Sequence, residues 1–269
     1  MLNYLLYINW NADPTLFEIG PLVFRWYGVL FALGLLTGFQ LVKKAFLVDG
    51  LNEKQIDNIL YATVIGTIVG ARLGHVFFYD WDYYSQNLGE IPKIWEGGLA
   101  SHGGGIGIII GIWLYSKYGI QKSTLWTLDR LTIAVAAGSI FIRLGNLMNH
   151  EIIGIPASIP WAFIFNLVDE QPRHPAQLYE AITWIITLLT MSYVYWKTDK
   201  KKLTGYLFGL FLIMAFSFRF LIEFVKNSQG GFENSIGNII STGQLLSIPF
   251  ILTGVILMVK SKSAKTLAT

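Results

Sequence analysis

A cluster of polar residues lies at the end of one of the most apolar stretches of the sequence. It comprises four residues within about three helical turns, at or just past the end of a run long enough to cross a membrane: Arg143, Asn146, Asn149 and Glu151. Ionisable side chains on membrane helices usually face a bundle interior or a wet cavity and indicate function. Arg143 and Asn146 lie three residues apart, so one helix face can present both to the same ligand. In the structural alternative, Asn149 only caps the helix and Arg143 only extends to the membrane interface.

Two arginines suit an anionic ligand, and one histidine suits proton transfer. Arg219 would join Arg143, and a planar guanidinium group gives charge-assisted, often bidentate hydrogen bonds to phosphate. Glu223 lies four residues after Arg219 on the same face, where it either forms a structural ion pair or orients the arginine. His102 precedes three glycines, so its uncrowded imidazole can accept a proton near neutral pH; the alternative is a histidine that hydrogen-bonds at a helix end. The four histidines lack metal-ligand spacing, so no metal site is predicted.

The composition places these side chains in a membrane protein. Of the 269 residues, 53% are hydrophobic, 15% are aromatic and only 14% are charged, which indicates several membrane spans rather than a soluble domain. The net charge of +3 gives no support for nucleic-acid binding. The chain has no cysteine, which excludes disulfides, thiolate metal sites and a cysteine nucleophile. Residues 1–10 are apolar but lack a basic region and a small-residue cleavage site, so an interfacial segment is expected instead of a cleaved signal peptide.

The apolar runs predict an all-α integral membrane protein with about seven transmembrane helices. The runs cover residues 22–43, 57–79, 100–117, 127–148, 177–196, 204–225 and 243–260. Twelve lysines follow the odd-numbered runs and few basic residues follow the even-numbered ones, so the positive-inside rule predicts an outside N-terminus and a cytoplasmic C-terminus. Small residues at every fourth position of the second and third runs are expected to let helix backbones approach closely. They are Gly66, Gly70, Gly74, Gly103, Gly107 and Gly111.

We expect one membrane-embedded catalytic domain over residues 1–269, with residues 151–176 as a small periplasmic cap between the fourth and fifth helices. This segment is rich in prolines, which predicts an ordered, partly helical cap rather than a flexible linker. With the predicted orientation, nearly all unusual polar side chains fall in the outer third of the spans, so the chemistry should face the outer leaflet. A transporter would instead place its polar site near the midplane between repeated halves, and no repeat is visible.

One segment resembles the signature of bacterial prolipoprotein diacylglyceryl transferases. It reads Arg143-Leu-Gly-Asn146-Leu-Met-Asn149-His-Glu151-Ile-Ile-Gly154. Further matches follow in order along most of the chain: Asp13-Pro14, Gly20-Pro21, Arg25-Trp26-Tyr27-Gly28, Gly70-Ala-Arg72-Leu-Gly74, Ser101-His102-Gly103-Gly104, Arg173-His174-Pro175-Ala-Gln177-Leu-Tyr179-Glu180, Phe218-Arg219-Phe220, Glu223-Phe224 and Gly243-Gln244. The cytoplasmic loops and the two termini lack a match. Lys226 departs from the arginine expected in many members, which keeps the charge but loses the planar fork.

The resemblance implies transfer of a diacylglyceryl group from phosphatidylglycerol to the thiol of the lipobox cysteine in a prolipoprotein signal peptide, with release of glycerol phosphate. It also implies a multi-pass protein of the bacterial inner (cytoplasmic) membrane, surrounded by membrane lipids, with its site toward the periplasmic leaflet and no cofactor. Carried onto this chain, it makes His102 the candidate base and Arg143 and Arg219 the clamps for the departing phosphate. Glu223 would orient Arg219. The implied substrate-binding residues are Tyr27, Asn146, Glu151, Gly154 and Gln177.

Two other function classes remain open on the residues alone. A lipid or small-anion carrier would use the same arginines without any covalent change to the lipid. A membrane scaffold would need the glycine faces but not the arginines. The group that removes the thiol proton is also open, because a tyrosinate or direct assistance by an arginine can take the place of His102.

Overall fold

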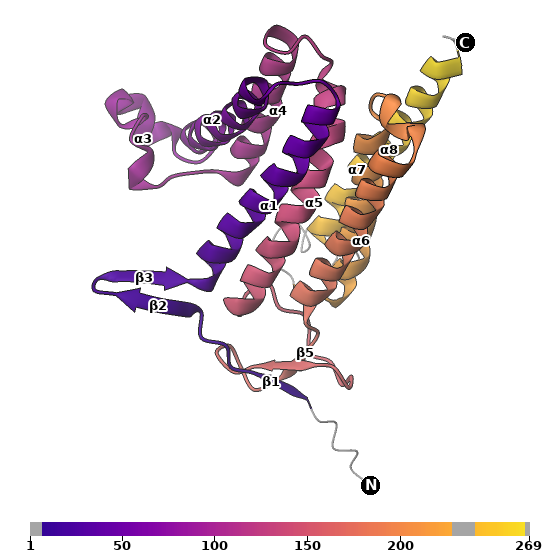
Figure 1. Cartoon of the computed structure of the whole chain (residues 1–269). Helices are drawn as coiled ribbons and strands as arrows, with labels where there is room; N and C mark the ends of the chain where they lie inside the picture. Colours follow the sequence, from indigo (N-terminus) through magenta and orange to yellow (C-terminus); the bar gives the residue numbers. More distant parts are fainter. Residues whose placement is uncertain (1–6, 228–239, 267–269) are drawn as a thin grey trace. The chain divides into compact units, whose positions relative to one another are not determined.

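The computed structural model describes residues 7–227 and 240–266, and within these ranges the chain is mostly helical (Figure 1). The α-helices are α1 (Trp26–Val48), α2 (Glu53–Phe78), α3 (Trp81–Gln86), α4 (Ser101–Tyr118), α5 (Thr124–Met148), α6 (Ala176–Lys197), α7 (Tyr206–Ile222) and α8 (Thr242–Thr266). Short 3-10 helices are η1 (Leu88–Glu90), η2 (Ile94–Glu96), η3 (Asp199–Lys202) and η4 (Glu223–Val225). The strands are β1 (Ile8–Trp10), β2 (Thr15–Ile19), β3 (Leu22–Arg25), β4 (Phe163–Phe165) and β5 (Pro172–Arg173).

Six helices of the described chain are long and apolar enough to cross a membrane: α1, α2, α5, α6, α7 and α8. The third predicted span forms α4, but α4 is not among the six. It has 18 residues, and His102, Lys117 and five glycines dilute its apolar content. A multi-pass membrane protein is therefore supported, whereas the seventh span and the orientation stay predictions.

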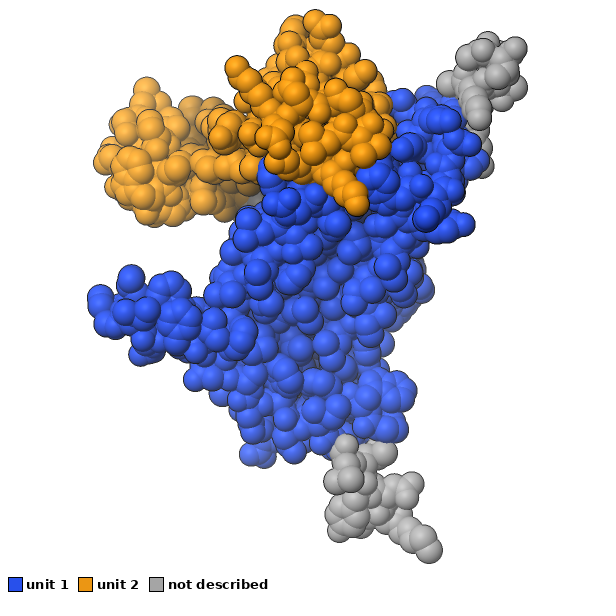
Figure 2. Space-filling view, viewed as in Figure 1, with its two compact units in different colours: residues 1–42, 131–269 blue, residues 43–130 orange. Residues whose placement is uncertain are grey.

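The chain divides into two compact units (Figure 2). The first unit contains residues 1–42 and 131–269, and the second contains residues 43–130. In the second unit, α2 and α4 pack along their glycines. A Cβ atom on Gly70 would lie 2.3 Å from the carbonyl oxygen of Gly103, and one on Gly107 would lie 2.0 Å from that of Gly66. The predicted close packing through small residues is confirmed, because any side chain at these positions would separate the two backbones.

In the first unit, glycines also bring helices together. A Cβ atom on Gly38 of α1 would lie 2.8 Å from the carbonyl oxygen of Ala134 on α5. A Cβ atom on Gly209 of α7 would lie 2.7 Å from the carbonyl oxygen of Gly254 on α8. Figure 1 shows α6, α7 and α8 running beside one another in this unit. These contacts hold α1 against α5 and α7 against α8.

The segment between α5 and α6 is ordered, but the expectation of a partly helical cap is wrong. It contains β4 and β5, which pair antiparallel, and β4 also pairs in parallel with the N-terminal strand β1. Prolines disfavour a helix because each lacks an N–H group and clashes with the preceding turn. The segment carries Pro156, Pro160, Pro172 and Pro175. Of the predicted interfacial segment 1–10, residues 1–6 lie outside the described residues, and residues 8–10 form β1.

A small apolar core supports this cap. Leu147, Ile153, Phe163 and Phe165 are buried together, and Trp10 packs against them. The indole Nε1 of Trp10 also donates a hydrogen bond of 3.0 Å to the carbonyl oxygen of Leu147, near the end of α5. The N-terminal strand is thereby fixed to the helix that carries the polar cluster.

A second, two-stranded sheet leads directly into α1. Strands β2 and β3 form an antiparallel hairpin in which the rings of Phe17 and Phe24 stack at 4.6 Å. Because β3 ends at Arg25 and α1 begins at Trp26, no loop residue separates them. This connection sets where the first turn of α1, including Tyr27, meets the rest of the first unit.

Candidate functional site

The polar cluster at the end of α5 forms a hydrogen-bonded chain. Nη1 of Arg143 donates to Oδ1 of Asn146 at 3.2 Å, and Nδ2 of Asn146 donates to Oε1 of Glu151 at 2.8 Å. Asn149 adds a longer bond of 3.3 Å to the same carboxylate oxygen. The predicted shared face of Arg143 and Asn146 is confirmed. Asn149 belongs to the network around Glu151, so it does more than end the helix.

The turn that carries Glu151 is strained. His150 and Ile152 on either side of it have φ values of 54° and 60°, which are unusual for residues other than glycine and most unusual for a β-branched one. Such conformations persist only where surrounding contacts impose them, and they are common at functional sites. Here the backbone N–H of Glu151 donates to the carbonyl oxygen of Asn146 at 3.0 Å, and Nε2 of Gln177 donates to the carbonyl oxygen of Glu151 at 2.6 Å. These bonds hold the carboxylate of Glu151 beside α5.

Gln177 is fully buried at the start of α6, where it supports this turn. Its Oε1 atom has no hydrogen-bond partner among the described residues. A buried amide oxygen without a partner is costly, and a ligand or a water molecule can satisfy it. The position of Gln177 is consistent with a role in ligand binding through Oε1. Its amide nitrogen already donates to the carbonyl oxygen of Glu151.

Tyr27 reaches the same region from α1. A Cβ atom on Gly145 would lie 2.8 Å from Cδ2 of the Tyr27 ring, so the ring packs directly against α5 between Arg143 and Asn146. Glycine at position 145 is needed for this approach because any side chain there would displace the ring. The structure therefore brings Tyr27 next to the signature segment.

Glu180 on α6 contacts two cations, and local spacing in the sequence predicts neither pairing. Its Oε2 atom lies 2.9 Å from Nε of Arg143, and its Oε1 atom accepts a hydrogen bond of 3.3 Å from Nζ of Lys226. The contact with Arg143 is an ion pair without hydrogen-bond alignment, since neither atom has a hydrogen-bond partner. An acid inside an apolar run requires a cation nearby, and that is the signal that could have found this pair.

A small cavity connects the two predicted clamps. It has a volume of about 40 Å³ and lies between the ends of α5, α6 and α7. Arg143, Glu180 and Arg219 line it together with apolar side chains, including Trp184 and Phe218. A cavity of this size holds one or two water molecules, so a phosphate group requires the side chains around it to move. Arg143 and Arg219 nevertheless face one space from different helices.

The predicted pairing of Glu223 with Arg219 is not formed. α7 ends at Ile222, and the N–H of Glu223 still donates to the carbonyl oxygen of Arg219, but the Glu223 carboxyl group makes no ion pair with Arg219 among the described residues. The Glu223 carboxyl group lies instead against Gly243, where a Cβ atom would be 2.7 Å from both of its oxygens. Gly243 is in the first turn of α8, and a helix N-terminus stabilises a negative charge.

Gly154 lies where the cap, η4 and the start of α6 meet. Its N–H donates to the carbonyl oxygen of His174 at 3.0 Å, and its own carbonyl oxygen accepts a bond of 3.2 Å from Nη1 of Arg173. Arg173 also pairs with Asp169, and this hydrogen-bonded guanidinium group lowers the pKa of Asp169 below its ordinary value. Partial burial lowers the pKa of His174 below 6.5 because it disfavours the charged imidazole.

His102 belongs to the second unit, in the first turn of α4, and its side chain is exposed. In the same unit, Arg72 donates to four backbone carbonyl oxygens, those of Glu90, Ile91, Gly97 and Gly98. The guanidinium group of Arg72 is thus occupied in holding a loop. This arrangement explains an arginine at that position without any ligand.

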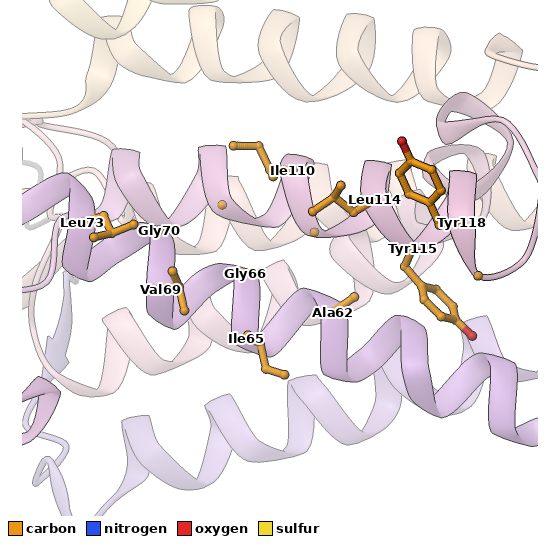
Figure 3. A pocket seen from close by; sticks show the side chains of 13 residues that line it. Ala62, Ile65, Gly66, Val69, Gly70, Leu73, Ile110, Leu114, Tyr115 and Tyr118 are labelled. Carbon is orange, nitrogen blue, oxygen red and sulfur yellow. The ribbon is translucent and has the colours of Figure 1, made fainter. Parts of the chain in front are cut away.

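A second cavity is apolar and contains no predicted site residue (Figure 3). It is a groove of about 710 Å³ between α2 and α4 in the second unit. Glycines and aliphatic side chains such as Ile65 and Leu114 line it, and Tyr115 and Tyr118 lie toward one end (Figure 3). A groove of this composition follows from the glycine packing of the two helices and offers no group for chemistry.

Comparisons with known proteins agree with the resemblance. A family model for prolipoprotein diacylglyceryl transferases matches residues 14–260. A phosphatidylglycerol–prolipoprotein diacylglyceryl transferase of Tolumonas auensis is 48% identical over 258 residues, which cover 95% of this chain and 98% of that protein. Proteins of the same name from Chloroherpeton thalassium and Bacteroides fragilis are 46% and 41% identical, covering 95% and 98% of this chain and 94% and 100% of their own length. This chain belongs to the prolipoprotein diacylglyceryl transferase family.

Proposed function

We propose that this protein transfers the diacylglyceryl group of phosphatidylglycerol to the lipobox cysteine of prolipoproteins, the first step of bacterial lipoprotein maturation. The cysteine sulfur attacks the glyceryl carbon that carries the phosphate, and a thioether bond forms. The carbon–oxygen bond to the phosphate breaks, and glycerol phosphate leaves with the electron pair. The observation that carries the proposal is the arginine pair, Arg143 and Arg219, which lines one cavity at the helix ends.

The arginines would act on the leaving group. The phosphodiester carries one negative charge, and the departing monoester gains a second as the carbon–oxygen bond breaks. Guanidinium groups placed where this charge develops stabilise the transition state more than the bound lipid. Asn146 and Glu151 would support Arg143 through the hydrogen-bonded chain already described, and Tyr27 would close one side of the site.

The proton of the cysteine thiol must also be removed. A free thiol has a pKa of about 8.5, so only a few per cent is thiolate at neutral pH. His102, whose side chain is exposed, is the proposed base, as the family resemblance implies. The cationic surroundings of the two arginines would also favour the thiolate.

The site is proposed to open toward the periplasmic leaflet of the inner membrane. Both substrates carry long apolar segments, which suit lateral entry between membrane helices rather than entry from water. The predicted outside N-terminus would place the polar end of α5 and the cap on the periplasmic side. Phosphatidylglycerol would arrive from the surrounding lipid, and the signal peptide of the precursor would bring the cysteine.

The decisive test uses purified protein in vesicles that contain phosphatidylglycerol. A peptide with a lipobox cysteine is added and its intact mass is measured over time. The expected result is a gain of one diacylglyceryl group, together with an equal amount of released glycerol phosphate. A peptide with serine in place of cysteine should gain nothing. Movement of lipid between leaflets without any change in peptide mass would favour a carrier and contradict the proposal.

A further inference from the structure

We infer that Lys226 is a positioning residue that acts on Arg143 through the carboxylate of Glu180. This inference rests on the proposed function and adds a third cation to the arginine pair. The carboxylate of Glu180 is shared, with one oxygen 2.9 Å from Nε of Arg143 and the other 3.3 Å from Nζ of Lys226. Because Arg143 and Lys226 share the carboxylate of Glu180, loss of the contact with Lys226 changes the contact with Arg143.

Both charges of the supporting pair are well removed from water. The side chain of Lys226 is 5% exposed and that of Glu180 is 8% exposed, whereas that of Arg143 is 19% exposed. Buried charges interact strongly because little solvent screens them, and removal of one partner leaves the other unpaired. The exposure rises along the series from Lys226 to Arg143. Lys226 and Glu180 are therefore placed to support Arg143, which is the most exposed of the three and can reach a ligand.

The backbone holds Lys226 in place. It follows η4 directly and forms a β-bridge with Gly154 of the cap. The neighbouring residues are also fixed, since the N–H of Ile155 donates to the carbonyl oxygen of Val225 at 3.0 Å and the N–H of Asn227 donates to that of Ile153 at 3.1 Å. Lys226 thus connects the cap and the end of α7 to α6 through Glu180.

Charge balance gives this arrangement its effect. If Glu180 served Arg143 alone, the pair would be neutral and the carboxylate would compete with a phosphate for the guanidinium group. With Lys226 on the second oxygen, the three groups carry a net charge of one positive unit. Nε of Arg143 faces Glu180 and Nη1 binds Asn146, while Nη2 donates to no described residue. That nitrogen is available for an anionic ligand.

The test is a double-mutant cycle of Lys226→Met and Glu180→Gln in the vesicle assay. Methionine keeps the apolar stem of lysine and removes the charge. We expect Lys226→Met to lower kcat by roughly 10- to 100-fold, because the Glu180 carboxylate then serves Arg143 alone and competes with the departing phosphate, while KM for phosphatidylglycerol changes less than about threefold. In the Glu180→Gln background, the same substitution should change kcat by less than about twofold, because the carboxylate through which it acts is gone.

Two further variants separate positioning from general damage. Lys226→Arg keeps the positive charge and should retain most of the wild-type kcat. Lys43→Met removes the lysine of another ion pair, 2.9 Å from Glu53, whose side chain is 70% exposed, and it should be silent because exposed pairs contribute little. Thermal unfolding of all variants provides the folded fraction. Glu180→Gln leaves the buried Lys226 without its carboxylate, so this single substitution should lower the melting temperature by more than the double variant does.

The outcomes separate this inference from the proposed function. An active wild-type protein with equal effects of Lys226→Met in both backgrounds would overturn the inference and leave the transferase proposal intact. A loss of kcat that disappears after correction for the folded fraction would overturn it too. An inactive wild-type protein would contradict the proposed function, and the coupling in thermal unfolding would then decide whether Lys226 and Glu180 act as a pair.

Discussion

Replacement of Gly154 by alanine should break the backbone contacts that connect the cap to the residues around Arg143. A Cβ atom at this position would lie 2.5 Å from the carbonyl oxygen of His174 and 2.6 Å from that of Val225. Both obstacles are backbone atoms, so no side chain can rotate away. The φ angle of Gly154 is not positive, so its backbone conformation does not require glycine. Glycine is needed here because there is no room for a side chain.

The size of the effect follows from the displacement. Raising a separation of 2.5 Å to the 3.4 Å at which ordinary contact begins requires a backbone shift of roughly 0.9 Å. That shift would break two hydrogen bonds of 3.0 Å, from Gly154 to His174 and from Ile155 to Val225. With about 1 kcal/mol for each bond and 1–3 kcal/mol for overpacking, the free energy of unfolding should fall by about 3–5 kcal/mol. Such a loss leaves many proteins folded.

Gly154→Ala should also lower the rate of transfer, even in the fraction of protein that stays folded. The β-bridge between Gly154 and Lys226 transmits the shift toward Glu180 and Arg143. A misplacement of about 1 Å in a catalytic arrangement can lower the rate by roughly 100-fold, and we expect a loss of this order in the transfer assay.

The assay combines chemical unfolding in mixed micelles, hydrogen exchange of the cap amides and the rate of peptide lipidation. Gly89→Ala is the control, because no atom lies within 4 Å of a Cβ atom there and its φ is not positive. It should leave stability and rate near the wild-type values. An alanine variant at position 154 with unfolding free energy within about 0.5 kcal/mol of wild type, the range of ordinary surface substitutions, and with nearly full activity would refute the reasoning.

Three further predictions concern single side chains. Arg143→Ala should lower the rate of transfer by roughly 100-fold or more while the protein stays folded in membranes. A rate near that of the wild type would show that Arg143 has no part in the mechanism. His102→Gln should lower kcat by roughly 100-fold or more if His102 is the base, and activity retained across a pH series would make it structural. The folded-state pKa of His174 lies below 6.5, so its contribution to stability is present above pH 6.5 and is lost as the pH falls through the folded-state pKa. Hydrogen exchange of the cap should therefore accelerate on acidification, and His174→Gln should weaken this dependence; equal pH slopes in both proteins would contradict it.

Local patterns allowed much of the chain to be predicted. Run length and hydropathy indicate membrane helices because a bilayer demands about 20 apolar residues, and six such helices are present. A spacing of three residues places Arg143 and Asn146 on one face, and their hydrogen bond follows. Glycines four residues apart predict close helix packing, which α2 and α4 display. The signature segment around Arg143 indicates the family.

Pairings between distant segments could not be predicted in this way. Trp10 pairs with Phe165, and no local pattern selects one partner strand for a three-residue strand. The prolines of the cap exclude a long helix, but they do not indicate a sheet. The position of the Glu223 carboxyl group is a related case, since it lies against Gly243 of α8, a residue from a different helix.

Sequence patterns were enough to identify the segments that can cross a membrane, the polar residues at the end of the fourth apolar run and the family of the chain. These properties depend on local spacing and composition, which are present in the chain before it folds. Only the tertiary structure decided that Glu180 lies between Arg143 and Lys226, and that Tyr27 packs over Gly145. Such contacts depend on which helix ends meet and at what depth, and this is set by the packing of whole elements rather than by any one segment.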